Sequence, residues 1–316
     1  MDRILVIGGT GSLGKTLLAH FVGTYEVYVF SRDEAKHVAI KKMYPEVKSL
    51  IGDIRDRDAV FNAILRSKPD IIINAAALKN VPEVEEAPME GIKTSLTGTE
   101  NINISVKLIG RPCKVLTVST DKAAAPVNSY GMAKALQERL HIRSNGDGVV
   151  CNAVRYGNVL ESRGSLIPLL KERLSKGKSV FITHKDMSRF FMTLDASVQL
   201  IKTALLDDEG GKIFVPTIRS AKIADVIDVF REAYGASHDS VTIGKIRPGE
   251  KLAEVLVCKE ELSRTELVND VYVIHDILTD KEFNDLGDVY SSDSPGVLLD
   301  RDELVEFLKE TGVLDA

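Results

Sequence analysis

The sequence has 316 residues with 41 Lys and Arg against 46 Asp and Glu, and its formal net charge of -5 argues against a general nucleic-acid surface. Cys113, Cys151 and Cys258 lie far apart, and no two histidines have a metal-ligand spacing, so we expect neither a disulfide framework nor a metal site. No signal peptide precedes the first strand, and no apolar run approaches the ~20 residues that span a bilayer. We therefore expect a soluble, cytoplasmic protein without membrane insertion.

The first half of the chain alternates short apolar runs with helical patterns. Strands are expected over residues 4–7, 27–30, 47–51, 71–74, 115–119 and 149–154, with helices over 12–21, 33–43, 56–66, 84–108 and 128–143. This alternation predicts an α/β fold with a doubly wound parallel sheet. The runs are solidly apolar, which is typical of strands covered on both faces.

The pattern becomes less regular after about residue 158, which predicts a second, smaller part that covers a substrate. We expect a dinucleotide-binding domain over 1–157, to which residues 190–215 return through a helix over 194–206. Residues 158–189 and 216–316 are expected to form a smaller C-terminal α/β substrate-binding part. A polar loop is expected over 280–299, before a final helix over 302–311.

A glycine pattern follows the first predicted strand directly. Gly8, Gly11 and Gly14 allow a tight turn and a close approach of the backbone to a pyrophosphate. The helix that follows would offer its free N–H groups and its positive end to the phosphates. The strand before and the helix after favour a dinucleotide site over an ordinary tight turn.

The end of the second predicted strand indicates which dinucleotide binds. An acidic residue there takes the ribose 2′-hydroxyl of NAD, whereas a nearby arginine accommodates the 2′-phosphate of NADP. Ser31 and Arg32 occupy this place, which predicts NADP, although Arg32 could instead be solvated while Asp33 caps the next helix. Asp53 is expected to accept a hydrogen bond from the adenine amino group, and the small residues 75–77 would let the cofactor lie close.

A polar group of residues follows the fifth predicted strand. Tyr130 and Lys134 are four residues apart on a predicted helix, so they share a face. A lysine ammonium beside a tyrosine lowers the pKa of the phenol, which can then take a proton from a hydroxyl group. Ligands bind at the carboxyl edge of such sheets, so Thr120, Asp121 and Lys122 should face the same pocket; the alternative is a helix-capping and exposed-turn role.

Several stretches together resemble the extended short-chain dehydrogenase/reductases, and more closely the C5-inverting UDP-N-acetylglucosamine 4,6-dehydratases. They are GGTGSLG (8–14), SRDE (31–34), NAAALKNVP (74–82), STDKAAAPVNSYGMAK (119–134), RYGNVLESRGSLIP (155–168), SRFFMT (188–193) and RPGEKLAEVL (247–256). The resemblance implies a Rossmann-type fold, bound NADP, a UDP-sugar substrate and a homo-oligomer. The Asp121-Lys122 pair is its sharpest element, since other sugar 4,6-dehydratases carry Asp-Glu there.

The resemblance also implies a role for each catalytic residue. Tyr130, helped by Lys134, would remove the proton of the 4-hydroxyl, and Thr120 would hydrogen-bond the 4-oxygen. Lys122 would remove the C5 proton, and Asp121 would protonate the departing 6-hydroxyl. Lys122 can act as a base only if its pKa is lowered, for which Lys134 or burial is the expected cause.

Binding residues follow by position in the matching motifs. The cofactor is expected to contact Gly8, Thr10, Gly11, Ser12, Leu13, Gly14, Ser31, Arg32, Asp53, Ile54, Ala75, Ala76, Ala77, Lys79, Tyr130, Lys134 and Tyr156. The substrate is expected to contact Lys79, Asn158, Arg163, Ser165, Arg189, Arg247 and Glu250, although Arg189 and Arg247 could instead form surface salt bridges.

The chain departs from the pattern of these dehydratases at three places. Ile7 replaces a threonine before the first glycine, and Ser95 replaces an asparagine of the active-site helix. After about residue 257 the likeness is loose, so no substrate contact is assigned there. Two other functions stay open: a nucleotide-sugar 4-epimerase or 4-reductase, and a non-catalytic NADP-binding sensor.

Overall fold

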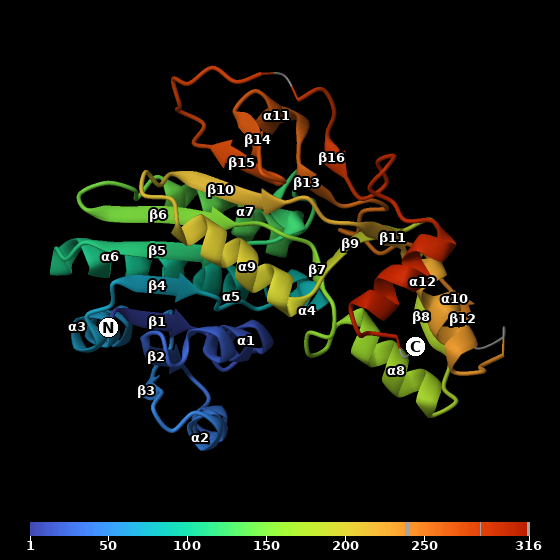
Figure 1. Ribbon diagram of the computed structural model, residues 1–316, viewed down its shortest axis with the longest axis horizontal. Helices are drawn as coiled ribbons and strands as arrows, with labels where there is room; N and C mark the ends of the chain where they lie inside the picture. The colour runs from blue at the N-terminus through green and yellow to red at the C-terminus, as the bar shows by residue number, and fades with distance from the viewer. Residues whose placement is uncertain (238–240, 285, 315–316) are drawn as a thin grey trace.

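A nine-stranded sheet forms the centre of the computed structural model, which describes residues 1–237, 241–284 and 286–314 (Figure 1). Its strand order is β14-β15-β10-β6-β5-β4-β1-β2-β3, parallel from β3 to β10 and antiparallel from β10 to β14. The strands are β1 (Arg3–Ile7), β2 (Glu26–Ser31), β3 (Lys48–Ile51), β4 (Ile71–Asn74), β5 (Cys113–Val118), β6 (Val149–Val154), β10 (Lys212–Pro216), β14 (Thr265–Val268) and β15 (Val271–His275). The predicted Rossmann-type doubly wound sheet is confirmed.

Both faces of this sheet are covered by helices, because successive apolar residues of each strand point to opposite sides. In β1, Ile4 and Val6 pack toward α1, α2 and α9, whereas Leu5 and Ile7 pack toward α3 and α6. The helices of this part are α1 (Ser12–Phe21), α2 (Glu34–Met43), α3 (Arg57–Ser67), α4 (Val81–Glu86), α5 (Pro88–Ile92), the π-helix η1 (Lys93–Thr97), α6 (Gly98–Ile109), the 3₁₀ turn η2 (Asp121–Ala123), α7 (Ser129–Ile142) and α9 (Leu194–Leu205). Helix α9 packs against α1 on one face of the sheet.

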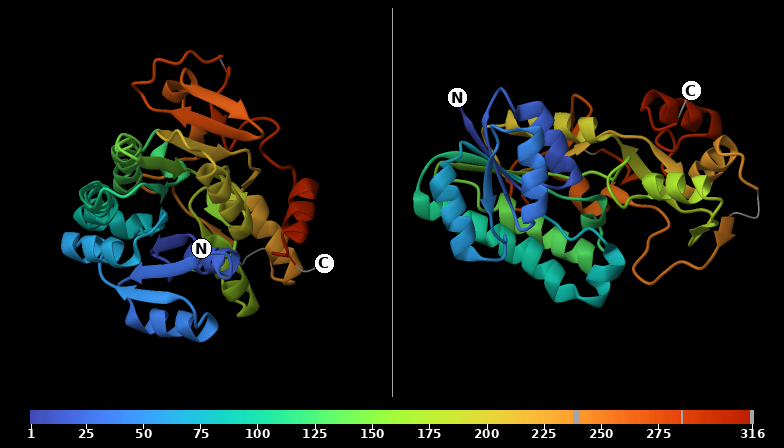
Figure 2. Two further views of the ribbon diagram at one scale, coloured as in Figure 1. Left: turned by 60° about the vertical axis from the view of Figure 1, so that its left-hand side comes forward. Right: turned by 90° about the horizontal axis from the view of Figure 1, so that it is seen from below.

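The second part has its own hydrophobic core, built from α8, β8, α10 and α12. Figure 2 shows this smaller part beside the large sheet, with the C-terminus in it. Its elements are β7 (Asn158–Val159), α8 (Leu166–Ser175), β8 (Val180–Ile182), β9 (Ser188–Met192), β11 (Ser220–Lys222), α10 (Ile223–Ala233), β12 (Val241–Ile243), β13 (Val255–Val257), β16 (Tyr290–Ser291) and α12 (Arg301–Glu310). The short helix α11 (Lys259–Leu262) lies instead beside β14 and β15, where Leu262 packs with residues of β10 and β15 (Figure 1).

One segment lies elsewhere than its sequence suggests. The pattern predicts that residues 216–316 all belong to the smaller part, but β15 pairs with β10 and β14 pairs with β15, so both strands extend the large sheet. The expected polar loop over 280–299 contains the short strand β16, which pairs with β13; residue 285 of that loop lies outside the described residues. These long-range pairings depend on partners far away in the chain, which local periodicity does not indicate.

A buried ion-pair network joins the two parts next to the sheet. Arg155, which directly follows β6, is 1% exposed and donates to Glu138 of α7 at 2.9 and 2.6 Å. The same guanidinium donates to Glu261 of α11 at 2.7 and 2.8 Å and to the carbonyl oxygen of Leu256 at 2.9 Å. The network therefore ties α7 and β6 to the segment that leads into β14.

Candidate functional site

A cavity of about 870 Å³ opens at the carboxyl edge of the sheet, between the first domain and the loop that follows β6. Every residue that the sequence assigns to the cofactor lines this cavity. Four of the five expected catalytic residues also line it, and these are Thr120, Lys122, Tyr130 and Lys134. The fifth, Asp121, is 1% exposed and lies immediately behind Lys122.

The turn after β1 leaves room for a ligand only because it is made of glycines. Gly8 has a φ of +78°, and a Cβ at this position would lie 2.8 Å from the backbone nitrogen of Ala76. A Cβ on Gly14 would lie 2.3 Å from the carbonyl oxygen of Gly9, so α1 can approach β1 closely. Gly11 precedes α1 without a side-chain cap, so the first N–H groups of the helix face the cavity uncapped. This cradle fits a dinucleotide pyrophosphate.

The end of β2 presents hydroxyl groups and a cation, as predicted. Ser31 Oγ lies 3.1 Å from Thr10 Oγ1 and 2.9 Å from His37 Nε2. The side chain of Arg32 is 57% exposed, and its guanidinium lies 3.4 Å from Asp53 Oδ2. The guanidinium is therefore accessible at the cavity wall and is held there weakly.

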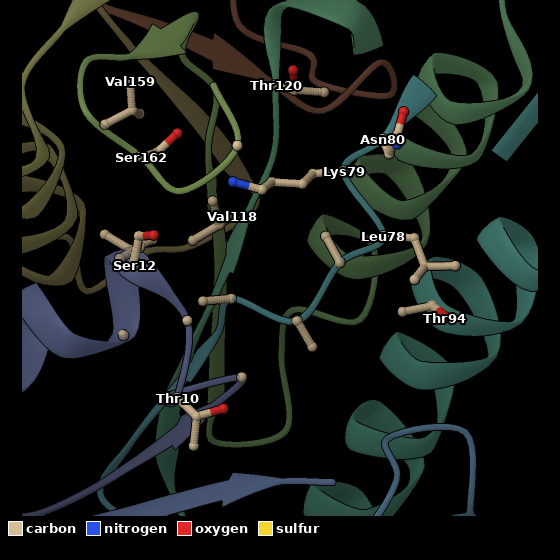
Figure 3. Close-up of a pocket in the computed structure, with 18 of the residues that line it drawn as sticks. Thr10, Ser12, Leu78, Lys79, Asn80, Thr94, Val118, Thr120, Val159 and Ser162 are labelled. Carbon is tan, nitrogen blue, oxygen red and sulfur yellow. The ribbon is translucent and has the colours of Figure 1, made fainter. Parts of the chain in front are cut away.

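A loop crosses the cavity between β7 and α8. The backbone N–H of Arg163 donates to Ser12 Oγ at 3.1 Å, and the ammonium of Lys79 donates to the carbonyl oxygen of Arg163. Lys79 extends across the pocket toward this loop, which also carries Ser162 (Figure 3). The loop thus connects the turn at the start of α1 with the segment that follows β4.

The 3₁₀ turn η2 places two charged side chains at the end of β5. Thr120 caps this turn, and its hydroxyl donates to Asp121 Oδ1 at 2.9 Å. Lys122 Nζ lies 3.0 Å from the same carboxylate oxygen. The second oxygen, Asp121 Oδ2, is buried and makes no hydrogen bond to any residue that the structure describes. An acid–base pair therefore stands at one end of the cavity, with one carboxylate oxygen uncommitted.

Helix α7 brings Tyr130 beside this pair because Gly131 lets it approach. Asn128 caps the helix by accepting from the N–H of Gly131 at 2.8 Å. A Cβ on Gly131 would lie 2.2 Å from the carbonyl oxygen of Lys122. The close contact between α7 and η2 thus requires glycine at this position.

We expect Gly131→Ala to destabilise the protein, although alanine normally stabilises a helix by about 1 kcal/mol relative to glycine. The added methyl group must push α7 away from Lys122, which also separates Tyr130 from that side chain. Thermal denaturation should show a lower Tm than for wild type, while Met132→Ala on the exposed side of α7 changes it little. A Tm above that of wild type would contradict this account of the contact.

The pKa of Tyr130 differs from the sequence expectation. Burial raises the pKa of the phenol to about 12, although the Lys122 charge and a hydrogen bond with Thr120 lower it. Lys134, which was expected to act on Tyr130, donates instead to the carbonyl oxygen of Val118 and to Gln137 Oε1, each at 2.8 Å. Burial lowers the pKa of Lys134 to about 8. The phenol is therefore protonated in this state of the site, because desolvation outweighs the nearby cation.

A glutamate that the sequence analysis did not assign completes the site. Glu254 Oε1 lies 3.1 Å from Lys122 Nζ. Burial lowers the pKa of Lys122, but Asp121 and Glu254 outweigh this effect and raise it to about 12. This is a correction to the lowered pKa expected for Lys122. Glu254 lies inside the motif RPGEKLAEVL, so the motif could have marked it as a candidate site residue. Nothing in the sequence indicated that it lies close to Lys122.

The expected substrate residues fall into two groups. Lys79, Asn158 and Ser165 line the cavity. Arg189 is 8% exposed and donates to the carbonyl oxygens of Ser188 and Leu252. It is therefore a buried residue that holds the backbone beside Glu254. This position is neither on the cavity wall nor in the surface salt bridge that was the alternative.

The three remaining substrate residues, Arg163, Arg247 and Glu250, do not line the cavity. Arg247 stands with its guanidinium 6.0 Å from the ring centre of Phe181. Its backbone N–H donates to Glu250 at 2.9 Å. Both are on the segment between β12 and β13, whose Gly249 carbonyl oxygen accepts from Asn128 at the start of α7.

Ser95, one of the positions where the chain departs from the dehydratase pattern, lies in a π-helix. The turn η1 (Lys93–Thr97) contains Ser95, which is 2% exposed, and Thr94, which lines the cavity. Such one-turn widenings of helices are frequent at functional sites. Here the widened turn lies between α5 and α6 and delivers Thr94 to the wall opposite the loop with Ser162 (Figure 3).

Comparison with known proteins identifies relatives along nearly the whole chain. Residues 4–276 match the model of a family described as polysaccharide biosynthesis protein. An uncharacterized membrane protein of Methanocaldococcus jannaschii is 38% identical, over 98% of this chain and 96% of its own length. A UDP-glucose 4-epimerase of Rickettsia canadensis is 39% identical, over 87% of this chain and 83% of its own.

Solved structures share the arrangement. Pen from Bacillus thuringiensis is 29% identical, with a TM-score of 0.90 over 99% of this chain and 98% of its own. The dTDP-glucose 4,6-dehydratase DesIV from Streptomyces venezuelae, solved with NAD and TYD bound, is 23% identical with a TM-score of 0.70, over 79% of this chain and 86% of its own. At that identity it supports the fold alone. Although one relative is named a membrane protein, no helix within the described residues is long and apolar enough to cross a bilayer.

Proposed function

The chain belongs to the family of polysaccharide biosynthesis proteins, and on that premise we propose that it is a C5-inverting UDP-N-acetylglucosamine 4,6-dehydratase that uses bound NADP. Its product would be a UDP-2-acetamido-2,6-dideoxyhexos-4-ulose, a precursor for glycans. The observation that carries the proposal is the buried Asp121–Lys122 pair beside Tyr130 at one end of the cavity. The cytoplasmic location expected from the sequence and the homo-oligomeric state that the resemblance implies stay predictions.

The glycine cradle and the residues at the end of β2 would hold the dinucleotide. Its pyrophosphate would lie against Gly8 and Gly11 at the start of α1, and Arg32 would face a 2′-phosphate. Structures of similar proteins contain NAD, so the choice of NADP depends on Ser31 and Arg32 of this chain. The bound nicotinamide supplies a hydride acceptor at the start of the reaction and a hydride donor at its end.

Tyr130 would take the proton of the sugar 4-hydroxyl during oxidation at C4. Thr120 lines the same part of the cavity and can hydrogen-bond the 4-oxygen. Because the phenol is protonated in this state of the site, it must first release its proton to water in the open cavity. Lys122, whose charge lowers the pKa of Tyr130, supplies positive charge that favours the phenolate.

Asp121 and Lys122 would then remove water across C5 and C6. The ammonium of Lys122 cannot act as a base. Transfer of one proton from Lys122 to Asp121, across their 3.0 Å contact, would give a neutral amine and a carboxylic acid in one step. The resulting neutral amine of Lys122 can take the C5 proton, which the 4-keto group has acidified. The resulting carboxylic acid of Asp121 can protonate the departing 6-hydroxyl through its free oxygen. A proton from water that reaches C5 on the opposite face would then invert that centre.

The nucleotide would lie over the second part of the molecule. Asn158 and Ser165 line the cavity on this side, and Ser165 Oγ is buried without a hydrogen bond to any described residue. We propose that Asn158 contacts the diphosphate and that Ser165 faces the uracil. Arg163, Arg247 and Glu250 lie on the segments nearest to this end, and their contact with the substrate would require movement of those segments.

An NMR time course of the sugar in deuterated water tests the function directly. Incubation of the purified protein with UDP-N-acetylglucosamine and NADP⁺ should yield a C4 ketone, a C6 methyl group and an inverted C5 that carries deuterium. No reduced cofactor should accumulate, because the hydride returns to the sugar. A product that differs only at C4 would reject the dehydratase.

The second candidate is a UDP-sugar 4-epimerase, since several Rickettsia relatives carry that name. An epimerase shares the tyrosine, the lysine and the cofactor cradle, but it has no water to eliminate. It therefore has no use for a buried carboxylate and ammonium side by side, as Asp121 and Lys122 are here. The same time course decides, because an epimerase forms neither a ketone nor a methyl group.

The cofactor preference gives a separate prediction for Arg32. We expect Arg32→Ala to raise the Kd for NADP about tenfold or more while the Kd for NAD changes less than twofold, because the 2′-phosphate loses a charge-assisted hydrogen bond. Isothermal titration with each dinucleotide measures both constants. Lys41→Ala, farther along α2, is the control, and an equal loss for NAD and NADP would contradict the role of Arg32.

A further inference from the structure

Glu254 is a buried carboxylate of the second part of the molecule, and it lies next to the pair Asp121 and Lys122. It directly precedes β13 and is 2% exposed. Its backbone is held on both sides by one serine: the N–H of Glu254 donates to Ser292 Oγ at 2.9 Å, and the N–H of Ser292 donates to the Glu254 carbonyl oxygen at 2.8 Å. The side chain is therefore rigidly placed by a segment more than 120 residues away from the pair.

Three cations surround this carboxylate. Oε1 lies 3.1 Å from Lys122 and 3.8 Å from Arg189, and Oε2 lies 3.7 Å from Lys251. Oε2 is buried and makes no hydrogen bond within the described part of the chain. Lys251 itself donates to the carbonyl oxygen of Ala124, just after η2, at 2.7 Å. The segment 251–254 thus contacts the catalytic turn through two separate side chains.

Lys122 is consequently held from two directions. Asp121 contacts its ammonium from the turn η2, and Glu254 contacts it from the second part of the molecule. A lysine side chain is flexible along its four-carbon stem, so one contact leaves its ammonium mobile, whereas two fixed carboxylates define its position. Burying an ion pair is costly, and without Glu254 the ammonium of Lys122 would keep one carboxylate contact, to Asp121, instead of two.

We infer that Glu254 is a positioning residue for Lys122, which keeps the amine where it can reach C5 of the sugar. The inference rests on the proposed dehydration. Glu254 itself does not line the cavity and acts only through the lysine. It should consequently affect the removal of water and leave the earlier oxidation at C4 unchanged.

The test is Glu254→Gln, which removes the charge and keeps the shape. We expect kcat for the methyl product to fall tenfold to a hundredfold, on the order expected when a reacting group is misplaced, with KM within about twofold of wild type. Because oxidation continues while elimination is slow, the absorbance of reduced nicotinamide should appear transiently in a single turnover. Glu306→Gln, an exposed glutamate on α12, is the matched control and should behave as wild type.

A double-mutant cycle separates positioning from a general structural effect. If Glu254 acts through Lys122, then Glu254→Gln should cause no further loss when Lys122 is already methionine. Losses that multiply, or a loss in kcat without accumulation of reduced cofactor, would overturn the inference. If Glu254→Gln does not fold, Glu254→Asp retains the charge at a greater distance, and normal kinetics for it would also overturn the inference. Failure of the proposed function is distinct, because wild type itself would then form no ketone or methyl group.

Discussion

Tyr130→Phe is expected to lower the rate of 4-keto product formation by about 10²- to 10⁴-fold, the usual range for loss of a general acid–base group. The substitution removes only the phenolic oxygen, which lines the cavity next to Lys122 and Thr120. The ring keeps its packing, so the Kd for UDP and for NADP should stay within about twofold of wild type. Product formation by NMR and nucleotide binding by calorimetry measure the two expectations.

The same variant tests the non-catalytic alternative. A sensor that only binds NADP would lose nothing when the phenol is removed, so unchanged cellular function in Tyr130→Phe would favour it. Tyr234→Phe is a suitable control, since that tyrosine lies 41% exposed at the end of α10, away from the cavity. Its product formation should equal that of wild type.

Arg155→Met is expected to lower the free energy of unfolding by about 3–5 kcal/mol, because it removes the cation that the buried Glu138 and Glu261 share and leaves, among the described residues, only Arg264, 3.5 Å from Glu261. Arg155 makes five hydrogen-bond contacts inside the protein, four of them to Glu138 and Glu261. Glu138 is 2% and Glu261 7% exposed, so water cannot replace the lost cation in the folded state. Chemical denaturation at neutral pH measures the loss.

The pH dependence of stability should change as well. Burial raises the pKa of Glu261, but Arg155 outweighs it and lowers the pKa from 4.5 to about 2. Because the pKa is lower in the folded state, the stabilisation is present above about pH 4.5 and is lost as the pH falls toward 2. In Arg155→Met the buried carboxylate favours its neutral form, so acidification from pH 7 toward 4.5 should recover part of the lost stability.

A surface ion pair supplies the control for this prediction. Arg301 contacts Glu232 at 2.5 Å, but both side chains are about half exposed. Such pairs contribute about 0–1 kcal/mol, so Arg301→Met should have a small effect that does not depend on acid. A loss of less than about 1 kcal/mol for Arg155→Met would show that the buried network is not the stabilising contact between the two parts.

Most of the first domain could be predicted from local pattern. Apolar runs such as residues 71–74 and 149–154 are strands within one or two residues of their predicted bounds, because each must be buried on both faces. The glycines after β1 and the pair Tyr130 and Lys134 stand on elements whose type and order the sequence already indicates. For that reason the residues expected at the cofactor all line one cavity.

The amino-acid sequence by itself determined the alternation of strands and helices, the glycine turn and the residue types at the carboxyl edge of the sheet, since all of these depend on neighbours within a few positions. Only the tertiary structure decided the pairing of β14 and β15 with the large sheet, the approach of Glu254 to Lys122 and the protonation of Tyr130 and Lys122. Strand pairing depends on partners far away in the chain. A pKa depends on burial and on charges at a few ångströms, which exist only once the chain has folded.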